Sequence, residues 1–286
     1  MHIENPSERP MTIRRTAHDA ACVLLLSGTM AYSLSAPQAA HDVYYSVPSW
    51  APDGKMIAFE SNRSGEAAVY AIRPDGSGLT RLTPSGTLGE QPNWSTDGRR
   101  IVFTSSRDGV RQLYLMTREG GDVVAIPGTT NGFLAAFSPD GRWLLFAAQD
   151  RRPSSQYRVF VMHPDGSNRR QLGDSTKSNE DPRWTTDGRR VVFTEAPLLE
   201  RLPTEAPKEF VRRRTMAQQL FSITPEGLDA RAVRPEEAPQ LSRERGLSPD
   251  GKWLVRSKQV QGVTGLYLLE QPTGNERLLD AGSPKP

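Results

Sequence analysis

Short apolar runs, separated by polar turns that contain glycine, recur along the chain after residue 40. The first pair is Met-Ile-Ala-Phe at 56–59 and Ala-Val-Tyr-Ala-Ile at 68–72, with Ser-Asn-Arg-Ser-Gly at 61–65 between them. Short runs that are rich in aromatic and β-branched side chains and bounded by glycine turns are typical of strands joined as hairpins. The pattern therefore predicts an all-β protein built from antiparallel hairpins.

This pair of runs belongs to a unit that occurs five times. Each unit begins with an aromatic residue or leucine, followed by two further residues, Asp, Gly and a basic residue. The aspartates of this motif are Asp53, Asp97, Asp140, Asp187 and Asp250, at intervals of 44, 43, 47 and 63 residues. Asp-Gly supplies the positive φ that a tight hairpin turn requires. A second glycine turn and a final short strand complete each unit, so the repeat predicts four strands per unit.

A four-stranded sheet of this size cannot bury both of its faces alone. A period of about 40–45 residues with four strands per unit is typical of a β-propeller, whose sheets stack as blades. We expect the aromatic residue before each Asp-Gly pair to pack between neighbouring blades. Five motif copies favour five blades, and the alternative is six, with one degenerate or shared. The expected propeller spans 41–286, with repeats at about 48–91, 92–134, 135–181, 182–244 and 245–280.

The fourth repeat is longer than the others. We assign its extra residues to an insertion at 196–216, because the strand at 220–223 and its turn still follow in the expected order. The insertion holds prolines and too few alternating apolar residues to form another blade. It also carries Arg212, Arg213 and Arg214, the only unbalanced basic cluster of the chain. This cluster is a hypothetical contact for anionic lipid head groups or an acidic partner, and the alternative is a solvated loop.

Residues 1–40 have the pattern of a secretory signal peptide and leader. Arg14 and Arg15 precede an apolar stretch at 20–34, and small residues follow at 35–40. A basic region, a short apolar region and small residues favour export by the Sec route, and the paired arginines leave the Tat route as an alternative. The mature chain is then periplasmic or secreted. No later segment has the roughly 18 consecutive apolar residues of a membrane-spanning helix.

Composition excludes several classes of function. The 36 basic and 33 acidic residues nearly balance, so nucleic-acid binding is not predicted. The single cysteine excludes an intrachain disulfide framework and a cysteine-rich metal site. The sequence contains no calcium-loop, phosphate-loop or dinucleotide motif, so we expect no metal and no cofactor. The 24 glycines and 23 prolines suit a chain with many turns.

The repeat resembles the WD40-like PD40 repeat of the TolB propeller family. Pro-Ser-Trp-Ala-Pro-Asp-Gly-Lys at 48–55 and Ile-Ala-Phe at 57–59 carry the resemblance, which extends over 48–280. It implies a propeller of the TolB type, whose family members carry an α/β domain before six blades and work with the Tol–Pal envelope system. Here only about ten residues separate the leader from the first repeat, so we expect that domain to be missing. A shared fold does not by itself transfer a role.

Polar residues at matching positions before two of the repeated tryptophans are the candidate binding site. In a propeller, the loops between blades share one face with the loops that join the second and third strands. This channel-mouth face is expected to carry the following set: Glu90, Gln91, Asn93, Glu180, Asp181, Arg183, Glu244 and Arg245. Two acids and an arginine that converge there could bind a charged group of a partner or a cation. The alternative is that they only solvate the channel mouth.

The sequence favours a binding scaffold over an enzyme. It contains no Gly-x-Ser-x-Gly nucleophile motif, and the repeats use up the mature chain. We therefore predict an exported, non-catalytic scaffold that recognises a protein or envelope polymer through the channel-mouth residues. The alternative is a small propeller hydrolase or lyase acting on carbohydrate or peptide, with Glu90, Asp181 and Arg183 at the channel. Neither the partner nor the oligomeric state is indicated.

Overall fold

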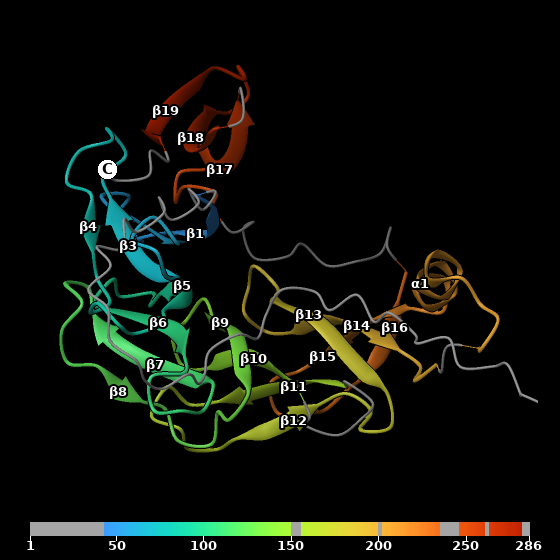
Figure 1. Cartoon of the computed structure of the whole chain (residues 1–286). Helices are drawn as coiled ribbons and strands as arrows, with labels where there is room; N and C mark the ends of the chain where they lie inside the picture. Colours follow the sequence, from blue (N-terminus) through green and yellow to red (C-terminus); the bar gives the residue numbers. More distant parts are fainter. Residues whose placement is uncertain (1–42, 150–155, 200–201, 235–245, 261–262, 282–286) are drawn as a thin grey trace, which may run out of the picture. The chain divides into compact units, whose positions relative to one another are not determined.

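Antiparallel sheets make up nearly all of the regular structure (Figure 1). The computed structural model describes residues 43–149, 156–199, 202–234, 246–260 and 263–281. The expected leader and two of the predicted channel-mouth residues, Glu244 and Arg245, lie outside these ranges. The described residues form five sheets, four of four strands and one of three, which confirms the all-β, blade-like architecture expected from the repeat.

Each sheet is a meander in which sequential strands pair. The first sheet contains β1 (Tyr45–Trp50), β2 (Ile57–Ser61), β3 (Ala68–Ile72) and β4 (Thr80–Arg81). The second contains β5 (Glu90–Trp94), β6 (Arg100–Ser105), β7 (Gln112–Thr117) and β8 (Val124–Ala125). The third contains β9 (Gly132–Phe137), β10 (Leu144–Gln149), β11 (Tyr157–Met162) and β12 (Arg170–Leu172).

The last two sheets complete the series. The fourth contains β13 (Ser178–Trp184), β14 (Val191–Ala196), β15 (Gln219–Ile223) and β16 (Arg231–Val233). The fifth contains β17 (Trp253–Val260), β18 (Val263–Glu270) and β19 (Glu276–Ala281). In the fifth sheet, an isolated bridge between Leu247 and Leu254 stands where the other sheets have their first strand.

In four of the five described sheets, a serine or threonine closes the Asp-Gly turn. In the second sheet, Ser95 Oγ donates to Asp97 Oδ1 at 2.6 Å and accepts from the backbone N–H of Arg100 at 2.9 Å. Gly98 takes the positive φ of 68° that the turn requires. The same serine or threonine bond to aspartate recurs at Ser138–Asp140, Thr185–Asp187 and Ser248–Asp250. In the first sheet Ala51 occupies the serine position.

The first strand of each four-stranded sheet contains a bulge. The pairing register shifts within all four of these strands. One residue in each bulge has a positive φ although it is not glycine: Val47, Gln91, Leu134 and Asp181, at 46° to 54°. Such conformations are uncommon for side-chain-bearing residues, and bulges often re-aim side chains next to functional sites. Two of these four bulge residues, Gln91 and Asp181, belong to the predicted channel-mouth set.

The core lies between the sheets. Four buried clusters each join two sheets, so the sheets pack face to face in the order fifth, first, second, third, fourth. The repeated aromatic residue takes part, as predicted: Trp50, Trp94 and Trp184 are members of these clusters. Trp184 Nε1 donates to Ala136 O of the preceding sheet at 3.2 Å, and Trp50 Nε1 donates to Gly246 O at 2.7 Å.

A short helix, α1 (Pro207–Met216), lies between β14 and β15 within the predicted insertion. The sequence pattern predicted a loop-like insertion here and no helix. The helix begins at a proline, which is favourable in the first turn, and Glu209 accepts a bond from the backbone N–H of Ala206 at 3.3 Å. The three consecutive arginines lie on it. In the described part of the chain, no helix is long and apolar enough to cross a bilayer.

Candidate functional site

A polar cluster joins the starts of the first and second sheets near the bulges. Its members are Tyr44, Glu60, Glu90, Gln91 and Arg111, which we call the mouth cluster. Glu60 lies on β2, and Glu90 and Gln91 lie on β5. Tyr44 directly precedes β1, and Arg111 directly precedes β7, in the loop after the second strand. The cluster thus combines an inter-sheet segment with a loop of the kind expected to share its face.

Glu60 is the buried centre of the mouth cluster. Only 8% of the residue is exposed. Its Oε1 accepts a hydrogen bond from Tyr44 Oη at 2.8 Å, and its Oε2 accepts one from the backbone N–H of Gln91 at 3.0 Å. Burial raises the pKa of the Glu60 carboxyl above its ordinary value, and the nearby Glu90 adds to this effect. Burial and the bond to Glu60 likewise raise the pKa of Tyr44.

Glu90, unlike Glu60, forms an ion pair with an arginine. Arg111 Nη2 lies 3.1 Å from Glu90 Oε2, and both side chains remain partly exposed, at 41% and 32%. The Arg111 guanidinium also lies over the Phe133 ring, 5.2 Å from its centroid. Its Nε is buried without a hydrogen-bond partner among the described residues. The pair therefore presents one carboxylate and one guanidinium, both reachable from solvent.

Gln91 links three sheets through its bulge. Its N–H bonds to Glu60 of the first sheet, as described above. Its Oε1 accepts from the backbone N–H of Leu134 in the third sheet at 2.9 Å and from Thr104 Oγ1 at 3.3 Å. Leu134 is itself the bulge residue of its strand. The side chain of one bulge thus holds the backbone of the next, which fixes the relative positions of the first strands at this end.

The fourth sheet carries a second group of charges. Glu180 accepts from Ser178 Oγ at 2.8 Å and forms an ion pair with Arg214 of α1. Nearby, Lys177 pairs with Glu195, whose side chain is 4% exposed, and this bond raises the pKa of Lys177. The inserted helix is therefore attached by Arg214 to the strand that carries the predicted acidic residues.

The structure places the predicted channel-mouth residues in separate groups. It brings Glu90 and Gln91 into the mouth cluster and places Glu180 against Arg214. Asn93 lies half-buried on β5, and Asp181 and Arg183 are exposed on β13. Arg213 pairs with Glu205 at 2.9 Å, whereas Arg212 is exposed. Between the two described groups, on β5 and β13, no hydrogen bond or ion pair forms.

Sequence reasoning missed Tyr44, Glu60 and Arg111. One signal could have found Glu60. It directly follows Phe59 in an otherwise apolar strand, at the position where the second sheet has Thr104 and the third has Ala147. A charged residue in a strand that is otherwise buried needs a partner. Tyr44 and Arg111 carry no comparable signal, because their role depends on contacts between sheets. Within the described ranges, no group of three or more metal-ligating side chains forms.

The chain is similar to known propeller proteins in sequence. The family model of the TolB beta propeller domain matches residues 33–201, more than half of the chain. Dipeptidyl-peptidase 5 of Porphyromonas endodontalis is 29% identical over 131 residues, 44% of this chain and 16% of that protein. The Tol-Pal system protein TolB of Syntrophus aciditrophicus is 43% identical over 35 residues, 12% of this chain and 8% of that protein. The chain thus spans a small part of the length of these relatives.

Solved structures of TolB proteins share the fold. TolB from Acinetobacter baumannii superposes with a TM-score of 0.50 at 17% identity, covering 81% of this chain and 53% of that one. The putative TolB from Agrobacterium tumefaciens superposes with a TM-score of 0.52 at 16% identity, covering 83% and 80%. Similarity at this level supports the fold and not a shared activity. From the family match, together with the repeated sheets, we conclude that the chain belongs to the TolB beta propeller domain family.

Proposed function

We propose that this chain is an exported, non-catalytic scaffold that binds a protein or envelope polymer through its channel-mouth residues. The observation that carries the proposal is the mouth cluster, in which backbone and side-chain bonds hold the polar groups in place across three sheets. Glu60 and Gln91 support the site, and Glu90 and Arg111 present charge to solvent. Preorganised charged groups at a rim favour recognition of a complementary partner.

The charges favour a partner with both basic and acidic groups. Glu90 and the exposed Asp181 offer carboxylates, while Arg111 and Arg183 offer guanidinium groups. Guanidinium groups suit planar carboxylates, and carboxylates suit lysine or arginine side chains. We therefore expect binding that weakens with salt, because the pairs at the rim are exposed.

Catalysis on carbohydrate or peptide is the second candidate. The match to a dipeptidyl-peptidase motivates it, although that match covers 16% of the peptidase. Within the described residues, the buried carboxyl of Glu60 has both oxygens engaged by Tyr44 and Gln91, which suits a structural role. If the chain is an enzyme, Glu90, Asp181 and Arg183 are the residues to test.

One pair of variants tests both candidates. The chain 41–286 is immobilised and exposed to an envelope fraction, with E90Q/D181N as the test variant. E226Q is the matched control, because Glu226 is an exposed acid on a turn between the third and fourth strands of its sheet. We expect the retained protein or polymer to fall at least tenfold with E90Q/D181N and not with E226Q. Equal retention by all three proteins contradicts the scaffold proposal, and turnover that E90Q/D181N abolishes supports the enzyme instead.

Residues 1–40 support export of the chain to the periplasm or beyond. The relative from Syntrophus aciditrophicus, named a Tol-Pal system protein, supports a role in the cell envelope. Fractionation of cells that express the full chain tests this localisation. We expect the mature form in the periplasmic or secreted fraction, and a full-length product that stays in the cytoplasm contradicts it.

A further inference from the structure

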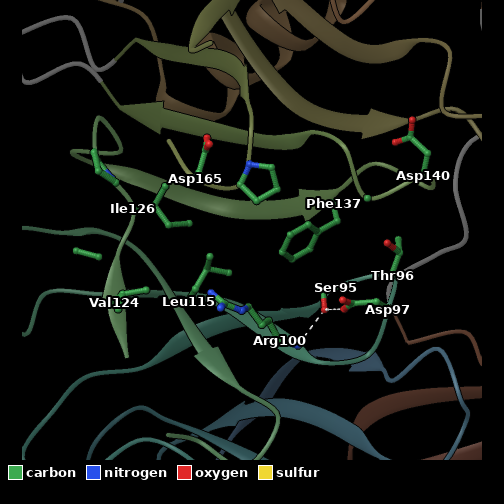
Figure 2. Close-up of a pocket in the computed structure, with 14 residues that line it drawn as sticks. Ser95, Thr96, Asp97, Arg100, Leu115, Val124, Ile126, Phe137, Asp140 and Asp165 are labelled. Carbon is green, nitrogen blue, oxygen red and sulfur yellow. Dashed lines mark hydrogen bonds between the residues drawn. The ribbon is translucent and has the colours of Figure 1, made fainter. Parts of the chain in front are cut away.

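A groove of about 530 Å³ lies between the second and third sheets (Figure 2). It opens at the end of the sheets that carries the Asp-Gly turns, whereas the mouth cluster lies at the opposite end. Leu115, Ile126 and Phe137 provide apolar walls, and Val124 is 49% exposed at the edge. Arg100 also lines the groove, and in Figure 2 its guanidinium lies next to Leu115.

The groove exists because two repeated positions differ in this part of the chain. The residue that follows the Asp-Gly-basic motif packs against a core cluster in three sheets, where it is Met56, Trp143 or Trp253. In the second sheet this residue is Arg100, whose side chain is exposed. The aromatic residue of the third sheet is Phe137, where three other sheets have tryptophan. Because Arg100 is charged and Phe137 is smaller than tryptophan, a space stays open here that large apolar side chains fill in the other sheets.

Arg100 lacks the partners that its counterpart has. Arg190, at the same position of the fourth sheet, bonds to Ser222 Oγ at 2.6 Å and to Asp229 Oδ2 at 2.6 Å. No described residue forms a hydrogen bond or ion pair with the Arg100 guanidinium. The chain carries an arginine here without a carboxylate within ion-pair distance among the described residues, which makes the guanidinium available to a ligand.

Three aspartates at the rim limit which ligand fits. Asp97, Asp140 and Asp165 line the groove, and each uses Oδ1 to accept a bond within its own turn. These bonds lower the pKa of all three carboxyls, so they are ionised at neutral pH. Their charge disfavours a polyanionic ligand. None of the three forms an ion pair with Arg100, so a single carboxylate between the apolar walls can reach its guanidinium.

We propose that this groove binds a partner peptide that presents an aromatic side chain next to one carboxylate. The aromatic ring packs against Leu115, Ile126 and Phe137, in the manner of the large side chains that fill the equivalent space elsewhere. The carboxylate pairs with the two N–H groups of the Arg100 guanidinium that face it, a geometry that arginine favours. This site is separate from the mouth cluster and does not rest on the proposed function.

Titration calorimetry with short peptides tests the proposal. The probe is N-acetyl-Asp-Trp-amide, with N-acetyl-Asn-Trp-amide lacking the charge and N-acetyl-Asp-Ala-amide lacking the ring. We expect the probe to bind the chain 41–286 at least tenfold more tightly than either control peptide. R100M removes the guanidinium and should weaken the probe at least tenfold, whereas E90Q/D181N should leave its affinity unchanged. Equal affinity for all three peptides, or no binding of any, overturns the proposal.

A second measurement guards against a variant that merely misfolds. R100M and R100W place at this position the residues that pack in the first, third and fifth sheets. If the groove is an unfilled space, at least one of them should raise the melting temperature while losing probe binding. A variant that melts at or above the wild-type temperature and still binds the probe with wild-type affinity also overturns the proposal.

Discussion

In four of the five Asp-Gly turns, one hydroxyl side chain stabilises the turn by bonding to the aspartate two residues later. The hydroxyl donates to the carboxylate and accepts from the backbone five residues on, so it satisfies two groups at once. In four turns the bond lowers the pKa of the aspartate. The first sheet, with Ala51, lacks this bond, and it provides a natural comparison within one chain.

Substitutions at the serine position of the Asp-Gly turn should lower stability where the hydroxyl is removed and raise it where one is added. We expect S138A to lower the free energy of unfolding by about 1 kcal/mol, because it removes both bonds of the hydroxyl. A51S should raise it by up to about 1 kcal/mol, because Ala51 is buried where the hydroxyl fits the repeat. Urea unfolding at neutral pH measures both. No loss with S138A would show that the turn needs only its backbone bonds.

The bond between Ser138 and Asp140 also predicts how the free energy of unfolding responds to acid. The pKa of Asp140 is lower in the folded chain than its ordinary value, so its bond stabilises the fold above that ordinary value. This contribution disappears as the pH falls through the folded pKa. We therefore expect the difference in unfolding free energy between wild type and S138A to shrink between pH 7 and pH 3. A difference that stays constant contradicts the assignment.

The contribution of Glu60 to the stability of the fold should depend on pH in the opposite direction. Its folded pKa is raised by burial, so the folded chain holds this proton more tightly than the unfolded chain does. Its contribution is therefore greatest below the ordinary pKa and is lost as the pH rises from there through the folded value. E60Q should gain stability relative to wild type between pH 4.5 and pH 7.5, measured by urea unfolding. E226Q, an exposed control, should follow wild type across that range.

At the scale of elements, the indole of a first strand ties one sheet to the next. Trp184 is 1% exposed, and its Nε1 donates to Ala136 O. Phe137 holds this position in the third sheet and cannot donate. The repeat predicted the aromatic packing from sequence alone, because position within a repeat determines burial. It did not predict the bulges, because a positive φ at Val47 depends on how β1 pairs with β2. It did not predict α1 either, because prolines at 197, 203 and 207 favour a loop over a helix.

Replacing the indole of Trp184 should weaken the packing between the third and fourth sheets. We expect W184F to lower the free energy of unfolding by about 2 kcal/mol, since it loses a buried hydrogen bond and leaves a small cavity. W143F is the matched control, because Trp143 is only partly buried and its indole forms no hydrogen bond among the described residues. Urea unfolding compares the two. An equal loss in both variants would show that ring volume alone stabilises the interface.

At the scale of the molecule, the first sheet packs against the fifth. Their shared cluster contains Phe59 of the first sheet and Leu266 of the fifth. Asp280 accepts a hydrogen bond from Tyr45 Oη and forms an ion pair with Arg63. The sequence predicted repeated sheets that stack, and this contact between early and late sheets follows from stacking. Two of the five residues of the mouth cluster were predicted, because Glu90 and Gln91 lie beside a motif whereas Tyr44, Glu60 and Arg111 do not.

The bonds to Asp280 should matter more than an exposed ion pair. We expect D280A to lower the free energy of unfolding by about 2 kcal/mol, because Tyr45 and Arg63 lose a partly buried acceptor. D229A breaks the pair with Arg190, but the Asp229 side chain is 63% exposed, so its loss should stay below about 1 kcal/mol. Thermal melts of both variants test the order. A larger loss with D229A contradicts it.

The contact between the first and fifth sheets also sets the timing of folding. The bond between Tyr45 and Asp280 joins residues 235 positions apart, so it forms only after nearly the whole chain has been synthesised. Until then, the face of the first sheet that packs against the fifth has no neighbour, while its other face can already pack against the second sheet. Contacts of such long range are slow to form, and exposed sheet faces promote aggregation. The face of the first sheet that meets the fifth is therefore the last to be covered, although its residues are synthesised before those of the other described sheets.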